Sequence, residues 1–218
     1  LRIQASLLSM ERVRKGSRDL LEQMGTQQRI NRPSDDPAGV ERLLEWKTVR
    51  GDIARYQGQI QQTSQWLRMT DLVLGRAADL VGQAAELAEG NVCSDEANRQ
   101  NAIRALEAIE SELFTLANTR CGERCLFAGS AAGVVPFARD TDAFGNTIVR
   151  YDGNDESLVA TIGGNATLEY SVSGTEAFVQ GGRSLFQVLA ELKSALGSGD
   201  GAAIGQLRVE LEGFRRQT

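Results

Sequence analysis

The stretch from Val40 to Gly90 constrains the fold more than any other part of the chain. Apolar residues recur in it at alternating spacings of three and four, and no proline interrupts them. This heptad pattern predicts one continuous helix, and a second apolar row beside the seam favours a multi-helix bundle over a two-stranded coiled coil. At about 1.5 Å per residue the helix would be about 75 Å long, so we expect an elongated rod. The seam comprises Ile53, Tyr56, Ile60, Thr63, Leu67, Thr70, Leu74, Ala77, Val81, Ala84 and Ala88, and the second row comprises Trp66, Val73, Leu80 and Leu87.

Shorter amphipathic patterns on either side predict further helices. One runs from Ile3 to Met24, and a return helix opens at Ser94-Asp95-Glu96 and ends near Asn118. The connection to the return helix is short, so we expect it to lie antiparallel to the long helix. Helical spacing comes back after Leu185 and again after Ile204. We expect the rod core to contain Ile53, Ile60, Leu67, Leu74, Val81, Leu106, Ile109 and Leu113.

The segment before the long helix is rich in turn formers and N-cap residues. Asp36 before Pro37 fits an N-cap followed by the first helical residue, because proline loses no hydrogen bond there. Ser34 is the competing cap. Either choice starts the helix within a few residues of Pro37.

Between residues 129 and 182 the helical pattern gives way to short strand-like runs. Residues 147–151, 157–162 and 167–173 are rich in β-branched or aromatic side chains and are separated by Gly- and Asn-containing turns. We therefore expect an α+β fold, namely an antiparallel helical rod with a small inserted β-rich domain. The expected divisions are rod residues 1–128, an outer domain of residues 129–183, and rod residues 184–218.

Composition argues against several classes of function. The chain has no histidine, the commonest general base near neutral pH and the commonest metal ligand. Its net charge of −5 has the wrong sign for binding nucleic acid through phosphates. No apolar run approaches the roughly 20 residues that cross a bilayer. The chain starts at Leu1 without an initiating Met, so we expect both ends to be trimmed.

Two clusters resemble reactive sites without meeting the requirements of one. Adjacent Asp35 and Asp36 suit helix capping better than metal binding or acid–base chemistry. Cys121 and Cys125 have neither redox nor zinc-site spacing, so we expect free thiols, with a local disulfide as the minor alternative and no role for Cys93. We expect no catalytic residues, no metal and no cofactor. Trp66 is expected in the core and Trp46 at a subunit contact.

Four motifs follow one another along the chain from Arg29. They are residues 29–39, residues 65–71, Leu116-Ala117-Asn118-Thr119, and residues 125–130 followed by Pro136-Phe137. In this order and spacing they resemble the family of hook-associated protein 3, the hook–filament junction proteins of bacterial flagella. The resemblance covers most of the chain from Arg29 onward and is strongest up to Phe137. Flagellin shares the helical plan, but the two prolines of the first motif and the Leu-Phe-x-Gly exit favour the junction proteins.

The resemblance implies a structural protein that is exported through the flagellar type III channel and located outside the cell. Its implied partners are further copies of itself in a ring, the first hook-associated protein, flagellin, and an export chaperone bound through a missing terminal segment. Neither nucleic acid nor membrane is among them. Because a charged loop at the end of a rod is well placed to meet neighbours, the expected subunit contacts are Arg29, Asn31, Arg32, Asp35 and Asp36.

Two alternatives remain open at this stage. One is a flagellin or flagellin-like filament subunit, and the other is a coiled-coil adaptor or secretion effector that binds a partner helix along its apolar seam. An enzyme is the least favoured class, because no nucleophile or acid–base set is present.

Overall fold

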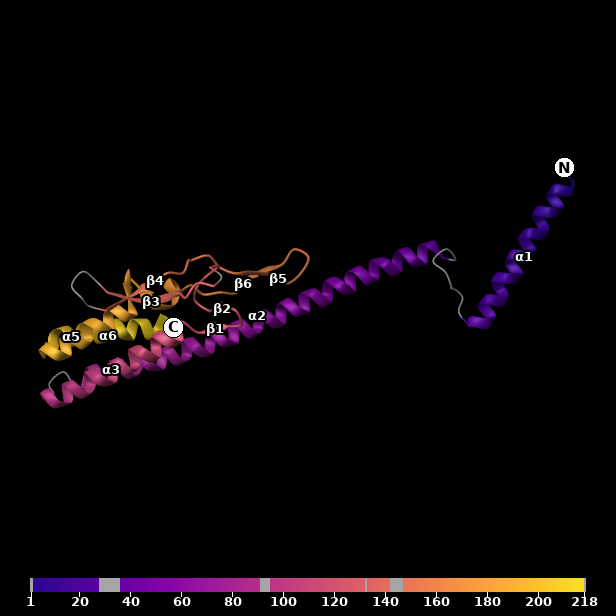
Figure 1. Cartoon of the computed structure of the whole chain (residues 1–218). Helices are drawn as coiled ribbons and strands as arrows, with labels where there is room; N and C mark the ends of the chain where they lie inside the picture. The colour runs from indigo at the N-terminus through magenta and orange to yellow at the C-terminus, as the bar shows by residue number, and fades with distance from the viewer. Residues whose placement is uncertain (1, 28–35, 91–94, 132, 142–146, 218) are drawn as a thin grey trace. The chain divides into compact units, whose positions relative to one another are not determined.

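The computed structural model is a mostly helical α+β fold (Figure 1). It describes residues 2–27, 36–90, 95–131, 133–141 and 147–217. The chain divides into two compact units, Leu1–Arg55 and Tyr56–Thr218, with the boundary inside the longest helix. The helices are α1 (Arg2–Thr26), α2 (Pro37–Gly90), α3 (Glu96–Ala117), α4 (Gly174–Phe178), α5 (Leu185–Ser198) and α6 (Gly201–Gln217). The strands are β1 (Arg120–Cys121), β2 (Arg124–Cys125), β3 (Phe137–Thr141), β4 (Thr147–Tyr151), β5 (Val159–Thr161), β6 (Thr167–Glu169), β7 (Val179–Gln180) and β8 (Arg183–Ser184).

The first unit contains α1 and the beginning of α2. Helix α2 starts at Pro37 as predicted, and Asp36 caps it. The Oδ1 atom of Asp36 accepts a hydrogen bond of 2.8 Å from the Gly39 amide, and the Asp36 carbonyl accepts one of 2.9 Å from Val40. Proline at the first helical position has no amide hydrogen to satisfy, so this pair of residues defines the helix start.

The cap allows a local stability prediction. Asp36→Ala leaves the Gly39 amide without its side-chain acceptor and is expected to cost about 1 kcal/mol of stability at the start of α2, whereas Asp36→Asn keeps an oxygen in place and is expected to cost much less. Amide hydrogen exchange of residues 38–42 measures this. Equal exchange in the two variants would contradict the capping role.

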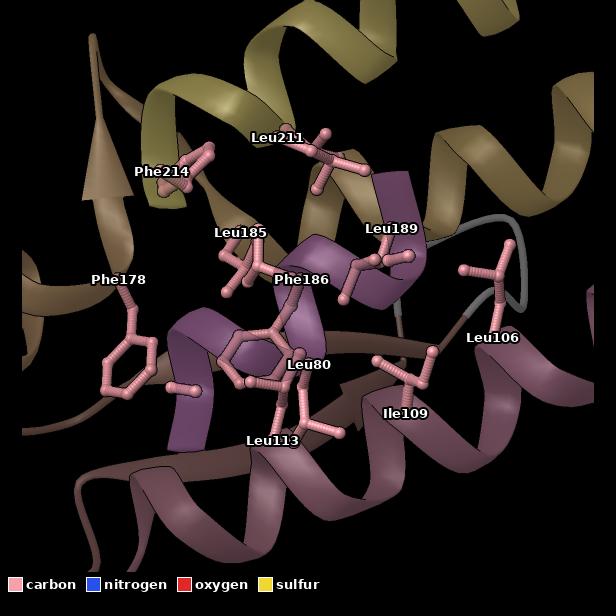
Figure 2. Close-up of a cluster of buried hydrophobic side chains, with 14 of the residues drawn as sticks. Leu80, Leu106, Ile109, Leu113, Phe178, Leu185, Phe186, Leu189, Leu211 and Phe214 are labelled. Carbon is pink, nitrogen blue, oxygen red and sulfur yellow. The ribbon is translucent and has the colours of Figure 1, made fainter. Parts of the chain in front are cut away.

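The second unit is built on one hydrophobic core that combines α2, α3, α4, α5 and α6 with residues of two further segments, Leu126-Phe127 and Phe137 (Figure 2). Leu80 from α2, Leu113 from α3 and Phe186 from α5 point toward one another in this core. Phe127 and Phe137, which lie outside the helices, are buried in the same cluster. The core therefore joins the helices and the β region into one packed body.

Ion pairs connect the helices around this core. Arg76 on α2 pairs with Glu112 on α3 at 2.7 Å, and Lys193 on α5 pairs with Glu110. Arg183 on β8 meets both Glu191 on α5 and Glu210 on α6, and its hydrogen bond to Glu191 is the main cause that raises the Arg183 pKa. Helix α3 runs back along the end of α2, as predicted (Figure 1).

The buried face of α2 agrees with the predicted seam only in part. Val81, Leu106, Ile109 and Leu113 lie in the core and Leu74 packs at its edge, but Ile53, Ile60 and Leu67 are 42–50% exposed. The prediction that these three are core residues is wrong for this structure. The buried row combines seam positions with the predicted second row and keeps the same alternating spacing. It comprises Thr63, Thr70, Ala77 and Ala84 of the seam and Trp66, Val73 and Leu80 of the second row. The apolar stripe is wide, and α3 and the β region cover the side that carries Trp66 and Leu80.

Among the residues that the structure describes, the β region consists of four separate antiparallel hairpins, β1–β2, β3–β4, β5–β6 and β7–β8. Strand β4 occupies the predicted residues 147–151, and β5 and β6 are shorter than the predicted runs. Strand β3 was not predicted, because its Arg139-Asp140-Thr141 end is polar and its strand character comes from pairing with β4. In that pairing Phe137 lies opposite Tyr151.

Candidate assembly surface and motif junction

Two of the sequence motifs meet through the side chain of Asn118, the C-cap of α3. Its Oδ1 atom accepts a hydrogen bond of 3.0 Å from the Phe137 amide, and its Nδ2 atom donates to the Phe137 carbonyl at 3.0 Å. The same Nδ2 lies 3.2 Å from the Phe114 carbonyl. The side-chain amide therefore takes the place of a neighbouring strand for Phe137 and fixes where the chain enters β3 after leaving α3.

The Phe137 ring lies at the centre of an aromatic cluster. Its centroid is 5.3 Å from Phe178, 5.6 Å from Phe186 and 5.2 Å from Tyr151. Phe127, from the motif at residues 125–130, stands edge-on to Phe178 at 5.2 Å. Such edge-to-face pairs contribute beyond their buried area, so the cluster stabilises the exit from the helices into the β region.

The Tyr151 hydroxyl connects three backbone segments next to this cluster. The hydroxyl oxygen lies 3.0 Å from the Phe127 carbonyl and 2.9 Å from the Asn154 carbonyl, and its one proton is donated to either of these two oxygens. The same oxygen accepts a hydrogen bond of 3.2 Å from the Gly174 amide. Gly129 lies beside it with φ of +66°, and a Cβ there would stand 2.1 Å from the Asn154 carbonyl oxygen. The glycine of the Phe-Ala-Gly motif is therefore required by a close backbone approach.

Burial raises the pKa of the Tyr151 phenol, Asp155 raises it further, and the hydrogen bond from Gly174 opposes the shift. Because the folded state holds this proton more tightly than the unfolded chain does, the resulting stabilisation is complete below the unfolded pKa of about 10 and is lost as pH rises through the folded pKa. We expect the stability of the second unit to fall above about pH 10.

Tyr151→Phe tests this dependence. The variant is expected to lose about 1 kcal/mol at pH 7 through the missing hydrogen bonds, yet to lose less stability than the unmutated chain between pH 9 and 11. Urea unfolding followed by circular dichroism at several pH values measures both effects. Tyr56→Phe is the control, and an identical alkaline slope in Tyr151→Phe and the unmutated chain would refute the assignment.

Sequence reasoning identified the motifs but did not predict the roles of Tyr151, Asn154 and Phe178. Asn154 donates from Nδ2 to the Ser130 hydroxyl and accepts from the Ser130 amide, both at 2.8 Å. The available signal was the strand prediction for residues 147–151, which placed Tyr151 at a strand end. Its partner Phe137 became identifiable only with the register of β3 and β4.

Most predicted subunit-contact residues lie outside the part of the chain that the structure describes. These are Arg29, Asn31, Arg32 and Asp35, whereas Asp36 is described and serves as the cap of α2. A different candidate assembly surface is visible in the first unit, where apolar side chains are exposed along α1 and the first turns of α2. Trp46, predicted at a subunit contact, is among these exposed residues, while Trp66 is buried against Tyr170. The exposed set on α1 is Leu7, Leu8, Met10, Val13, Leu20, Leu21 and Met24, and the set on the part of α2 within the first unit is Leu43, Leu44, Trp46, Val49 and Ile53.

The cysteines do not form a redox or metal site in the described structure. Cys121 is half-buried and Cys125 is buried, and both are free thiols. Cys121 pairs with Arg124 and Cys125 with Arg120, so the two thiols lie on opposite faces of the β1–β2 hairpin, which is why no disulfide joins them. Cys93 lies outside the described residues. Within the described ranges no group of three or more Cys, Asp or Glu side chains is arranged to hold a metal ion.

Known proteins of similar sequence come from bacterial flagella. Flagellar hook-associated protein 3 of Salmonella typhimurium is 24% identical over 160 residues, which cover 72% of this chain and 48% of the relative. A solved structure of a flagellar hook-associated protein from Vibrio parahaemolyticus covers 85% of this chain and 90% of that one, with a TM-score of 0.68 and 16% identity. The chain resembles flagellar hook-associated protein 3 in sequence and in fold.

FlgL from Bacillus cereus adds to this likeness, with a TM-score of 0.66 and 17% identity over 82% of this chain and 84% of that one. At these identities the solved structures establish the fold alone. No family model matches the chain. The chain spans about half the length of the Salmonella hook-associated protein 3 that it matches. The described helices include none that is long and apolar enough to cross a membrane.

Proposed function

We propose that this chain is a structural subunit of the bacterial flagellum that joins the hook to the flagellin filament. The role needs no reaction and no cofactor. The observation that carries the proposal is the joint similarity of sequence and fold to flagellar hook-associated protein 3. The motif junction supports it, because residues that carry the sequence resemblance, Asn118 and Phe137, hold each other in place in the fold.

The proposed partners follow from this role. Copies of the chain form a ring outside the cell, with the first hook-associated protein on one side and flagellin on the other. A chaperone of the flagellar export system delivers the subunit. The exposed apolar side chains of α1 and α2 support a role in assembly, because contiguous apolar surface on a soluble protein commonly marks an interaction site.

Complementation tests the function. The gene that encodes this chain is expressed in full in a motile bacterium that lacks its own hook–filament junction protein, and hooks are examined by electron microscopy while secreted flagellin is assayed. Filaments attached to hooks are the expected result. Bare hooks with flagellin shed into the medium, although the protein itself is exported, would reject the junction role. Long filaments formed by the purified protein alone would favour the flagellin-like alternative.

The charged segment before α2 is proposed as a subunit contact in this ring, through Arg29, Asn31, Arg32, Asp35 and Asp36. Its test must separate contact from capping, because Asp36→Ala would also weaken the start of α2. The pair Arg32→Ala with Asp36→Asn removes both charges and keeps the cap. Impaired swimming and filament loss in the complemented strain are expected. Normal swimming would remove this segment from the proposed contacts.

Residues 129–183 are proposed to form the part of the subunit that faces away from the axis of the flagellum. The turn between β5 and β6 contains Gly163 and Gly164, and a Cβ at Gly164 would meet no atom within 4 Å, so a short epitope tag fits there. Gold-labelled antibody is expected to mark the hook–filament junction of complemented cells. Unlabelled junctions on normally swimming cells would overturn this orientation.

A further inference from the structure

The hairpin formed by β5 and β6 is hydrogen-bonded only to itself. The Tyr170 amide donates to the Leu158 carbonyl at 3.0 Å, and the Leu158 amide donates to the Ser171 hydroxyl at 2.7 Å. Among the residues that the structure describes, no hydrogen bond or ion pair joins residues 157–172, which we call the strap, to the rest of the chain. The strap is therefore held in place by apolar contacts.

Both ends of the strap are fixed by polar contacts just outside it. On the N-terminal side, the Ser130 hydroxyl donates a hydrogen bond of 2.7 Å to the Glu156 carboxylate. On the C-terminal side, the Gly174 amide donates one of 3.0 Å to the Phe127 carbonyl, and Ser173 caps α4. The strap can therefore move only by turning about two fixed ends, which favours movement as a single body.

The hairpins before and after the strap are attached differently. In β3, the backbone of Phe137 forms two hydrogen bonds with the side chain of Asn118 on α3. In β8, the Arg183 guanidinium forms an ion pair of 2.6 Å with Glu210 on α6. Each of these hairpins would break a directed polar contact if it moved away from the helices, whereas the strap would break none.

The contact between the strap and α2 buries a polar atom that has no partner. Tyr170 stands edge-on to Trp66 of α2, with ring centroids 5.9 Å apart. Trp66 is 6% exposed, and its indole Nε1 atom has no hydrogen-bond partner among the described residues. A buried donor without an acceptor costs free energy that contact with water recovers. Closing the strap over Trp66 is therefore less favourable than its apolar contacts alone would make it.

We propose that the strap lifts from α2 as one body while the rest of the second unit stays folded, and that the unpartnered Trp66 N–H favours the lifted state. Such local opening costs less free energy than global unfolding, because few buried contacts are lost. Three strap residues pack against the hydrophobic core, and each is only partly buried, namely Leu158, Tyr170 and Val172. The inference concerns the single subunit and does not rest on the proposed assembly role.

Labelling of a buried cysteine in the folded protein tests the lifting. In a background with Cys93→Ser, Cys121→Ser and Cys125→Ala, one variant carries Ala160→Cys in β5 and the matched control carries Ala117→Cys in α3. Both positions are buried, with Ala160 8% and Ala117 0% exposed. A lifted hairpin is marginal in water, so lifting gives a thiol reagent access to position 160. Circular dichroism confirms that each variant keeps the helical content of the unmutated chain.

The cysteine at position 160 is expected to react about tenfold faster, or more, than the cysteine at position 117. Its rate should depend only weakly on urea below the unfolding transition, because local opening exposes little surface. The rate at position 117 should follow global unfolding and rise steeply with urea. Equal rates with equal urea slopes would overturn the inference, because the strap would then open only together with the whole unit.

An isosteric replacement of Trp66 tests the role of its N–H. Benzothienylalanine keeps the shape of the indole and has sulfur in place of the N–H, and a Trp46→Phe background confines the replacement to one site. The closed strap then buries no unpartnered donor, so labelling of Ala160→Cys is expected to slow about five- to tenfold. An unchanged or faster rate would refute the role assigned to the Trp66 N–H.

Amide hydrogen exchange of the unmutated chain gives an independent measurement. The Ile162 and Tyr170 amides are hydrogen-bonded within the strap, whereas the Asp152 amide donates to the Pro136 carbonyl at 2.8 Å beside the attached β3–β4 hairpin. After correction for intrinsic rates, the two strap amides are expected to exchange about tenfold faster, or more, than that of Asp152. Equal protection of all three amides would show that the strap is held as firmly as β3–β4 and would contradict the proposal.

Discussion

Phe137→Ala is expected to lower the free energy of unfolding of the second unit by about 3–5 kcal/mol. The side chain is buried and its ring contacts those of Tyr151, Phe178 and Phe186. Alanine removes the whole ring and leaves a cavity that β3 cannot collapse to fill, because the Phe137 backbone is held by Asn118. Urea unfolding followed by circular dichroism and by Trp66 fluorescence measures the loss.

The control for this prediction lies on the partner strand. Ile148→Ala changes an exposed residue of β4 and is expected to cost less than about 1 kcal/mol. Phe137→Leu retains much of the buried volume and is expected to fall between the two. If Phe137→Ala and Ile148→Ala destabilise the unit equally, the aromatic cluster does not hold the β region to the helices in the way described.

Asn118→Ala is expected to cost about 2–3 kcal/mol, although it removes only a small side chain. The change leaves the amide and the carbonyl of Phe137 without the side-chain partner that replaces a strand for them. An unpaired buried polar group costs about 1–3 kcal/mol, and the Asn118 side chain hydrogen-bonds two such groups, the amide and the carbonyl of Phe137. Asn118→Asp keeps the acceptor but not the donor, so its loss should be smaller than that of alanine.

A double-mutant cycle separates this hydrogen-bonding role from general packing. Asn118→Ala and Phe137→Ala disturb the same contact between α3 and β3. The double variant is therefore expected to lose less free energy of unfolding than the sum of the two single losses, by at least about 0.5 kcal/mol. Unfolding curves of the two single variants and the double variant give the coupling. Strict additivity would mean that Asn118 stabilises α3 alone and does not position β3.

The long helix was predictable from the sequence because a single signal repeats along it. The Asp36-Pro37 start and the Gly90 end agree with the observed bounds of α2, and each is a local rule that no distant contact overrides. Which edge of the wide apolar stripe is buried was not predictable. The buried edge depends on which side of α2 the helix α3 and the β region pack against. They cover Trp66 and leave Ile60 and Leu67 exposed.

The β region was predictable only where a strand carries its own apolar pattern, as β4 does. The two-residue strands β1, β2, β7 and β8 have too few residues for any periodicity, and β3 owes its form to its partner. The junction at Asn118 joins residues 19 positions apart in the sequence. Its motifs suggested that these residues matter together, but only the fold identifies the backbone groups that the amide satisfies.

The separation of the described part of the β region into four two-stranded hairpins bears on how this fold can diversify. In a continuous sheet, lengthening one strand shifts the pairing of its neighbours, whereas here each hairpin pairs only with itself. An isolated hairpin is marginal in water, so each depends on the helical core beneath it rather than on the next hairpin. Loop tips can therefore change in length one at a time, while the helices of the core keep their packing.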